Sequence, residues 1–410
     1  MNRLSTQELT SYKKFVDKAN RGETVTVAYL GGSITVGAAT FPLEGVNKDE
    51  CRYSYTYDVN RESWRALTFQ WMKDTFEKRP RQFRQVNAAI GGTGSIFGAF
   101  RAAKHLLEQR PDFLFIEFAV NDDKKGKLTR DNPHTDFSIY RTYTSIISQV
   151  KNVNPEIAMF IPVSTFREDT ALFEPDDFNI AAEETVKAAN LFCIPYTNIG
   201  DVFYRNKLPD GVEKHRLFDG EDTPGNAVHP SPQGHKAYAA GVIEVLGSLF
   251  RKFTFDFEKP SIDDLKPYPE HGKLYLAESL YDGIMGWELE NLPEREVRPV
   301  LDGYKKLASR NRQAAFTFVF EGSAAGIWFD LESTSARMDV IIDGKMLGVW
   351  QYNAACKDDF VLSNCTMFAA VLEAGKQHVL KLIPSETQNL KEGCEFCIGI
   401  IGAVVDCGLT

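Results

Sequence analysis

Val25-Thr26-Val27-Ala28-Tyr29-Leu30-Gly31-Gly32-Ser33-Ile34-Thr35 joins an apolar, β-branched-rich run to two glycines and a serine. This pattern is typical of a buried strand that leads into a tight turn, with Ser33 at the carboxyl end of the strand. Open α/β sheets place their binding sites at that edge, and glycines there let the backbone approach a ligand closely. A serine hydroxyl in this position can act as a nucleophile if a histidine lies within hydrogen-bond reach. Gly-Gly-Ser is also an ordinary turn sequence, so the other segments of the chain must decide whether Ser33 belongs to a functional site.

Further strand-like runs follow this one, and segments with helical spacing separate them. The other expected strands are 83–88, 113–120, 156–162 and 191–197, and the expected helices are 6–20, 62–76, 97–110, 137–153, 180–190 and 234–253. Five strands that alternate with helices predict a parallel, three-layer α/β domain.

The composition changes near Pro260, where prolines and charged residues suggest a linker. Asp343-Gly344 separates two short strand-like runs, which is a strong signal for a two-residue hairpin. The expected strands of this second half are 316–320, 326–331, 338–342, 346–350, 368–372 and 378–383. They predict an all-β sandwich or jelly roll. Because 410 residues exceed what one hydrophobic core usually fills, we expect two domains, residues 1–258 and residues 259–410.

The charge balance argues against a nucleic-acid partner. Lys and Arg number 47 against 56 Asp and Glu, which gives a net charge of −9 at pH 7 and disfavours a polyanionic ligand. The first residues have no apolar secretion core, and no later run approaches membrane-spanning length. We therefore expect a cytoplasmic protein without a membrane partner.

The cysteines do not form a recognisable metal site. The chain has 7 cysteines, and Cys394 and Cys397 form a lone Cys-x-x-Cys. Cys356 and Cys365 could complete four zinc ligands, but their spacing fits no standard zinc knuckle. We therefore expect buried free thiols, and neither a metal nor a disulfide framework.

Four polar or glycine-rich segments follow expected strands or precede the last expected helix. Ser33 follows the first strand, Gly92 the second and Asn121 the third, and His229 precedes the last helix. Ester hydrolysis needs a nucleophile, a base that takes its proton, and donors for the developing oxyanion. A serine, a histidine, a backbone N–H and an asparagine amide supply this set at one edge of a parallel sheet.

These segments resemble the sequence blocks of the SGNH (GDSL-type) hydrolase superfamily, in the branch whose first block reads Gly-Gly-Ser-Ile-Thr. Gly31–Thr35 matches the first block, Asn87–Gly92 the second, Val120–Asp122 the third and Val228–Pro230 the fifth. The resemblance covers roughly residues 24–250 and implies a flavodoxin-like fold, here followed by a β-sandwich domain.

The resemblance also implies the role of each site residue. Ser33 would be the nucleophile and His229 the general base. The oxyanion hole would consist of the backbone N–H of Ser33, the backbone N–H of Gly92 and the side-chain amide of Asn121. Gly91 is the alternative to Gly92 if the match is displaced by one residue.

The chain departs from the family at the third member of the catalytic triad, the acidic residue that orients the histidine. The family usually has an aspartate three residues before the histidine, and this chain has Asn226 there. A neutral amide is a poor partner for an imidazolium. Asp222 or Asp219 could replace the missing carboxylate, or a backbone carbonyl could orient His229 in a Ser-His dyad. We favour Asp222 and leave the dyad open.

The other histidines have simpler interpretations. We expect His235 to pack or cap within the last helix, and His105 and His134 to lie on the surface.

The predicted function is a serine esterase that removes small acyl groups, acetyl above all, from a carbohydrate or similar polar substrate. The carbohydrate part rests on analogy with related two-domain enzymes. The expected partner is a small-molecule or oligosaccharide ester; no cofactor is expected, and an oligomer stays open. The alternative is a carbohydrate-binding protein with a degenerate, inactive hydrolase domain, which Asn226 favours.

Overall fold

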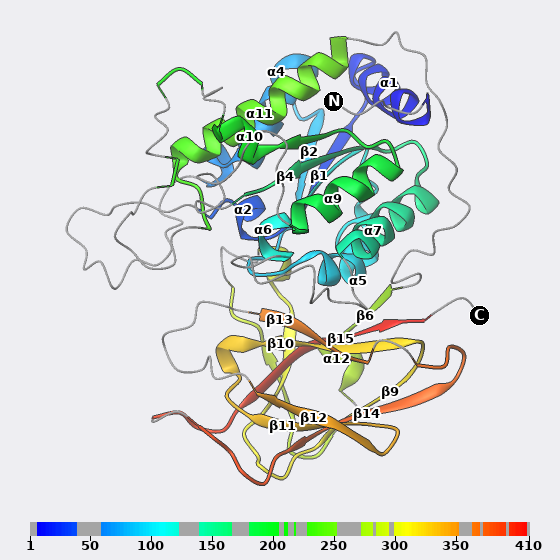
Figure 1. The fold of residues 1–410 in the computed structure, drawn as a ribbon, viewed down its shortest axis with the longest axis vertical. Helices are drawn as coiled ribbons and strands as arrows, with labels where there is room; N and C mark the ends of the chain where they lie inside the picture. The colour runs from blue at the N-terminus through cyan, green and yellow to red at the C-terminus, as the bar shows by residue number, and fades with distance from the viewer. Residues whose placement is uncertain are drawn as a thin grey trace, which may run out of the picture.

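The structure is a computed structural model, and two parts of the chain with different architecture are visible in it (Figure 1). It describes residues 6–38, 59–122, 139–165, 180–204, 209–211, 217–218, 228–251, 272–281, 284–294, 299–351, 363–369, 372–390 and 393–407. The expected domain boundary at residues 258 and 259 lies outside these ranges, and so do Asp219, Asp222, Asn226 and His134.

The first part is built on a five-stranded parallel sheet with the order β2-β1-β3-β4-β5. Its strands are β1 (Val25–Gly31), β2 (Phe83–Asn87), β3 (Phe113–Glu117), β4 (Ala158–Val163) and β5 (Tyr196–Asn198). This order is that of the flavodoxin-like doubly wound fold, in which the site lies where the strand order reverses, between the first and third strands. Every residue of β1 is buried, as expected for a central strand with helices on both faces.

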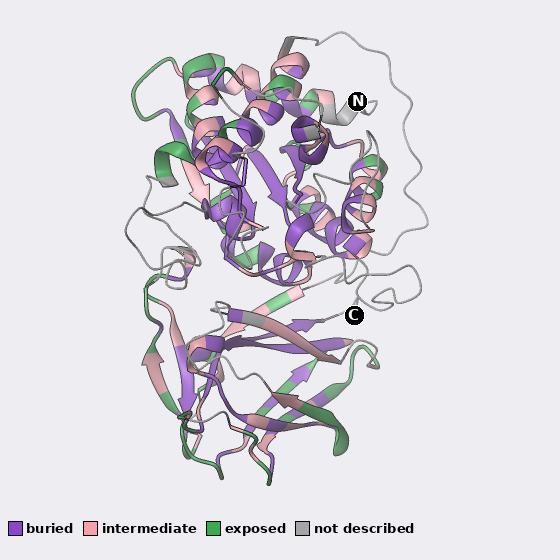
Figure 2. Cartoon of the chain, turned by 60° about the vertical axis from the view of Figure 1, so that its left-hand side comes forward, coloured by how far each residue is buried: buried purple, intermediate pink, exposed green. Residues whose placement is uncertain are grey.

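Helices cover both faces of this sheet (Figure 1). One face carries α1 (Thr6–Asn20), α4 (Trp64–Phe76) and α11 (Pro232–Arg251), and the other carries α5 (Ser95–His105), α7 (Ile139–Val153) and α9 (Ile180–Leu191). Shorter helices are α2 (Ser33–Val36), α3 (Val59–Glu62), η1 (Leu107–Gln109), α6 (Ala119–Asp122) and α10 (Ile199–Tyr204). The buried strands lie between these layers in Figure 2. Within the described ranges, no helix is long and apolar enough to cross a membrane.

The third strand is shorter than its sequence suggests. Residues 113–120 read as one apolar strand, but the strand ends at Glu117 and a single helical turn follows. The backbone N–H groups of Asn121 and Asp122 both donate to the carbonyl of Phe118. Ala119 and Val120 stay buried within this turn, so hydrophobicity alone does not reveal where the strand ends.

The second part consists of two antiparallel sheets that share one apolar core. The larger sheet has the order β13-β10-β15-β8-β7 with β6 paired to β15, and the smaller has the order β12-β11-β14-β9. The strands are β6 (Gly272–Leu276), β7 (Glu288–Asn291), β8 (Lys305–Ser309), β9 (Phe316–Glu321), β10 (Ala324–Asp330), β11 (Arg337–Ile342), β12 (Lys345–Gln351), β13 (Ser363–Ala369), β14 (Gln377–Pro384) and β15 (Ile398–Asp406). Short helices are α12 (Ala277–Leu280), η3 (Pro299–Leu301) and η4 (Leu331–Ser333). The predicted all-β architecture is therefore confirmed; we call this part the β domain.

The hairpin predicted at Asp343-Gly344 is present between β11 and β12. Asp343 and Gly344 have φ values of 52° and 79°. Two successive positive φ values are what a type I′ hairpin turn requires.

The sequence patterns missed β6, β7, β8 and β15, although all nine residues of β15 are buried. Ile400 and Val405 face the core between the two sheets, whereas Ile401 and Val404 face a second apolar cluster. Burial on both faces removes the alternation of polar and apolar residues by which a half-exposed strand is recognised.

The cysteines near β15 differ in part from expectation. Cys394 is disulfide-bonded, so the prediction of free thiols was wrong for this residue. Cys365 and Cys397 are free, as predicted, but they are half-buried and not fully buried.

Candidate active site

Ser33 and His229 form the centre of the candidate site. Ser33 is the first residue of α2, directly after Gly32 at the carboxyl end of β1. His229 precedes α11, and its Nε2 lies 2.7 Å from Ser33 Oγ. Both side chains are almost fully buried, with 7% and 5% of their surface exposed. A serine hydroxyl within hydrogen-bond distance of a histidine nitrogen is the pairing that an activated nucleophile requires.

The amide of Asn121 lies against the turn that carries Ser33. Asn121 belongs to the helical turn α6, and its Nδ2 donates a 2.7 Å hydrogen bond to the carbonyl of Thr93. A Cβ atom added to Gly32 would overlap this amide nitrogen. Only glycine therefore fits at position 32, because the asparagine amide occupies the space of a side chain.

Gly92 lies in a tight turn after β2. The backbone N–H of Ile90 donates to the carbonyl of Gly31 at 3.0 Å, and that of Thr93 donates to the carbonyl of Ile90. These bonds bring the turn alongside the end of β1. Gly92 has a φ of 75°, a conformation that costs glycine little. Gly92 and Gly91 both stay candidates for the backbone donor.

A buried carboxyl group connects the serine turn with the asparagine turn. Glu117 is 2% exposed, and its Oε2 accepts a 2.6 Å hydrogen bond from the hydroxyl of Thr35 on α2. Its Oε1 accepts a hydrogen bond from Ser164 at the end of β4, and Ser164 Oγ accepts the N–H of Val120. Burial raises the pKa of Glu117, and the two hydroxyl donors counteract this only in part.

Two buried arginines bind backbone carbonyls around the same turns. Arg65 donates from Nε to the carbonyl of Thr35 and from Nη2 to that of Val36, at the carboxyl end of α2. Arg101 donates from Nη1 to the carbonyl of Ala88 and from Nη2 to that of Gly31. Sequence reasoning missed Arg65, Arg101 and Glu117. The signal that could have found them is a charged residue among apolar neighbours within a predicted strand or helix.

Two other histidines lie within the described residues of this part. His235 is buried, accepts the N–H of Trp64 at Nδ1 and lies 2.9 Å from the carbonyl of Ala38 at Nε2. Burial lowers its pKa to about 4, and its role is packing, as predicted. The prediction that His105 lies on the surface was wrong, because the β domain covers it: it is 4% exposed, and its Nε2 lies 3.2 Å from Tyr304 Oη.

The orienting partner of His229 stays a prediction, since Asp219, Asp222 and Asn226 lie outside the described residues. The choice between Asp222 and a dyad is therefore a matter for mutagenesis.

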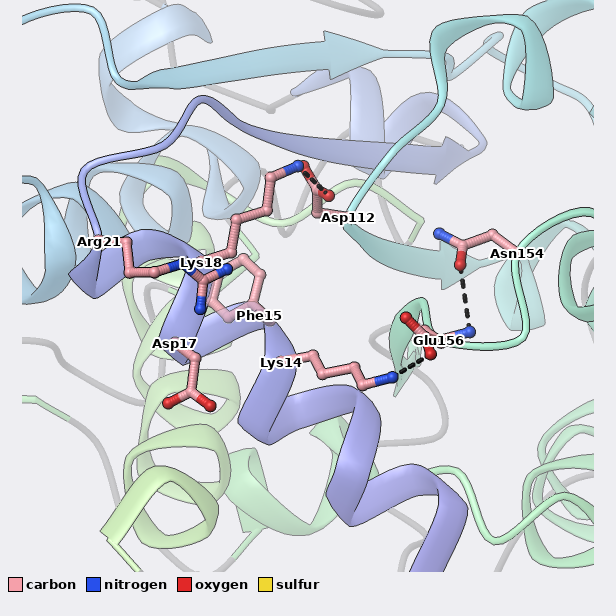
Figure 3. A pocket seen from close by; sticks show the side chains of 8 residues that line it. All are labelled: Lys14, Phe15, Asp17, Lys18, Arg21, Asp112, Asn154 and Glu156. Carbon is pink, nitrogen blue, oxygen red and sulfur yellow. Dashed lines mark hydrogen bonds and ion pairs between the residues drawn. The ribbon is translucent and has the colours of Figure 1, made fainter.

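A charged cavity of about 490 Å³ lies far from Ser33, at the amino ends of the strands (Figure 3). Lys18 pairs with Asp112 and Lys14 with Glu156 across it. Asp112 Oδ2 also accepts the N–H of Thr26. These charges neutralise one another in pairs, and the cavity lies at the edge of the sheet opposite to the candidate active site.

The flavodoxin-like sheet with the Ser33–His229 pair at its carboxyl edge is the arrangement that a serine hydrolase requires. Residues 29–237 match the model of the GDSL-like lipase/acylhydrolase family. The match spans half of the chain, and the chain belongs to this family, whose members are ester hydrolases by class.

Two solved structures are similar to the chain over nearly its whole length. One is a two-domain esterase (CEX) active on acetylated mannans, co-crystallized with mannopentaose. It has a TM-score of 0.71 and 21% identity, and the alignment covers 98% of this chain and 95% of that one. Another structure of a two-domain esterase (CEX) active on acetylated mannans has a TM-score of 0.72 and 20% identity, with 98% and 96% covered. At this identity the similarity shows a shared two-domain fold. No curated protein matches the chain in sequence.

Proposed function

We propose that this protein is a serine esterase that hydrolyses small acyl esters, acetyl esters above all, on carbohydrate substrates. The observation that carries the proposal is the 2.7 Å separation of Ser33 Oγ and His229 Nε2. In this geometry Nε2 takes the hydroxyl proton while Oγ attacks the acyl carbon of the ester. The attack produces a tetrahedral intermediate whose former carbonyl oxygen carries a negative charge.

Donors beside Ser33 would stabilise that oxyanion. The proposed donors are the amide of Asn121, the backbone N–H of Gly92 and the backbone N–H of Ser33. Thr93 supports this assignment of Asn121, because its carbonyl accepts one amide hydrogen and so fixes the rotation of the side chain. Preorganised donors in a water-poor site contribute more than the same donors in bulk water.

The intermediate then collapses and the acyl group is released. His229 Nε2 gives its proton to the oxygen of the leaving alcohol, which leaves an acyl ester on Ser33. Water attacks this ester while His229 again takes a proton, and the second collapse returns the proton to Ser33 Oγ. The products are the free alcohol and a carboxylic acid, which is acetic acid for an acetyl ester.

The carbohydrate substrate is supported by the esterases of similar architecture, which act on acetylated mannans. Their similarity extends over the β domain as well as the α/β part, since it covers 98% of this chain. A polar, acetylated oligosaccharide is therefore the substrate to test first.

The test compares the wild type with Ser33→Ala on p-nitrophenyl acetate and on acetylated mannan and xylan oligosaccharides. We expect wild-type turnover and its loss in the variant, because Ser33 carries the hydroxyl that lies 2.7 Å from His229 Nε2. Ser145→Ala is the matched control, since Ser145 is equally buried but lies on α7. Turnover by Ser33→Ala within about tenfold of wild type would exclude Ser33 as the nucleophile.

The alternative function has a distinct outcome. An inactive, carbohydrate-binding protein would bind the oligosaccharides in calorimetry yet release no acetate from them. It would also leave Ser33 unlabelled by a fluorophosphonate, which reacts with activated serines.

A further inference from the structure

Helix α5 lies between the candidate active site and the β domain (Figure 1). One side of the helix carries Arg101, which is fully buried. Its guanidinium donates one hydrogen bond to the carbonyl of Ala88 and another to that of Gly31. Gly31 ends β1 directly before Gly32 and Ser33, and Ala88 lies just after β2, before the Gly92 turn.

The same side of α5 packs on the β domain, because Phe97, Arg101 and His105 recur every four residues and so share one face of the helix. The ring of Phe97 lies 4.5 Å from that of Trp328, centroid to centroid, and His105 contacts both Trp328 and Tyr304. The shared apolar cluster combines residues of both parts: Ile90, Phe97 and Phe100 with Leu292, Leu301, Trp328, Ile401 and Val404. Trp328 is 0% exposed, and it belongs to this shared cluster and not to the core between the two sheets.

Phe97 connects Arg101 with the β domain. Arg101 lies over its ring at 5.7 Å and over that of Phe118 at 5.9 Å. The ring of Phe97 is therefore in contact with Trp328 of the β domain and with the guanidinium. Burial is strong enough to lower the pKa of Arg101 to about 9, which reflects how completely the surrounding side chains exclude water.

We propose that Arg101 is a positioning residue for the two turns of the oxyanion hole, and that the β domain holds it in place through Trp328 and Phe97. The inference rests on the proposed esterase function. A guanidinium presents its N–H groups in a rigid, planar fork, so one side chain sets the distance between the Ser33 turn and the Gly92 turn. Hydrogen bonds from a charged donor are stronger where water is excluded, and the β domain provides that exclusion.

The first test replaces Arg101. Arg101→Met keeps the length of the side chain but leaves both carbonyls without these donors, and Arg101→Lys keeps the charge but has no fork. With p-nitrophenyl acetate, we expect kcat to fall about tenfold to a hundredfold in Arg101→Met, with KM changed by less than about twofold, and Arg101→Lys to be intermediate. Lys104→Met is the control, since it removes an exposed cation from the same helix.

The second test uses a matched pair of tryptophans in the β domain. Trp328→Ala and Trp287→Ala each remove a buried indole, but Trp287 belongs to the core between the sheets and not to the interface. Both variants lose stability, so kcat is measured well below their melting temperatures. We expect a lower kcat only in Trp328→Ala. If that variant does not fold, Trp328→Phe replaces it, and a smaller decrease in kcat is expected.

Hydrogen–deuterium exchange provides a readout that does not depend on activity. Peptides covering residues 88–94 should exchange faster in Trp328→Ala and Arg101→Met than in wild type. In Trp287→Ala their exchange rate should equal that of wild type. Unchanged kcat and exchange in Arg101→Met, or equal loss in both tryptophan variants, would overturn the inference. Failure of the proposed function is distinguishable from this, because it appears as a wild type that hydrolyses no ester.

Discussion

Ser33 Oγ lies 2.7 Å from His229 Nε2, although the two residues are 196 positions apart in the chain. Ser33 lies just after β1, which is an inner strand of the sheet. His229 is held at the start of α11, which packs against α4 on one face of that sheet. Their contact therefore depends on the whole α/β part being folded, and so do the predictions that concern this site.

Asn121→Ala should lower kcat about 10²- to 10³-fold, the range observed when one oxyanion donor is removed. The amide lies directly against Gly32, and the helical turn that carries it stays intact without it. Steady-state kinetics with p-nitrophenyl acetate measures the effect. Asn154→Ala is the matched control, because Asn154 lies at the opposite edge of the sheet beside Pro111. A change confined to KM would instead assign Asn121 to substrate binding.

Asp222→Asn should lower kcat by orders of magnitude if Asp222 is the partner of His229, because the imidazolium would lose its anion. Asn226→Ala should then have little effect. In a dyad both substitutions would be mild, while His229→Ala would remain severe.

Asn226→Asp distinguishes an Asp222 partner from a dyad by adding a carboxylate and not by removing one. A carboxylate at the position customary in the family should increase turnover in a site that lacks one. Beside an existing Asp222 it would add like-charge repulsion and give no gain. Increased turnover would therefore contradict the role of Asp222.

Glu117 should make stability depend on pH above the ordinary pKa of a glutamic acid. Burial raises its pKa, so between its ordinary value and the raised value the folded state binds more protons than the unfolded state. Its stabilising contribution is complete below the ordinary pKa and is lost as pH rises through the raised one. Relative to Glu117→Gln, the free energy of unfolding of the wild type should fall by at most about 1.4 kcal/mol per pH unit in this window.

Denaturant unfolding of both proteins from pH 4 to pH 8 measures this difference, and a constant difference would contradict it. Thr35→Val extends the test, because the hydroxyl of Thr35 lowers the pKa of Glu117. Its removal should move the pH dependence to higher pH. Thr35→Ser keeps the hydroxyl and should leave the dependence near that of the wild type.

His378 and Asp343 should make the stability of the β domain fall as the pH rises above the ordinary pKa of histidine. Burial disfavours the imidazolium of His378, but the Asp343 carboxylate at 2.7 Å and the carbonyl of Glu373 outweigh it and raise the pKa. The stabilisation is therefore complete below the ordinary pKa of histidine and lost as pH rises through the raised value. His378→Gln should remove this loss, which thermal unfolding at pH 6 and pH 9 can measure. An unchanged pH dependence in that variant would refute the assignment.

Local patterns in the sequence were sufficient to predict the class of the fold, and they supplied the hypothesis for the chemistry of the site. The run before Gly31 and Gly32 predicted β1 and its turn, because an apolar run followed by glycines is a property of neighbouring residues. The same holds for the hairpin at Asp343-Gly344, which needs two positive φ values. The order of the four blocks indicated the family, and the family model confirms it.

The tertiary structure decided which polar side chains are buried and what they contact. Glu117, Arg65 and Arg101 occur in elements that were predicted. The sequence of those elements does not indicate that hydroxyl and carbonyl groups from distant segments bind these charged side chains. Likewise, His105 is buried only because the β domain covers α5. The environment of a side chain depends on segments far away in the chain, whereas periodicity and turn chemistry depend only on neighbours. For this reason the sequence predicted most of the strands, the hairpin turn and a set of candidate catalytic residues, and only the assembled fold established the contacts between distant segments.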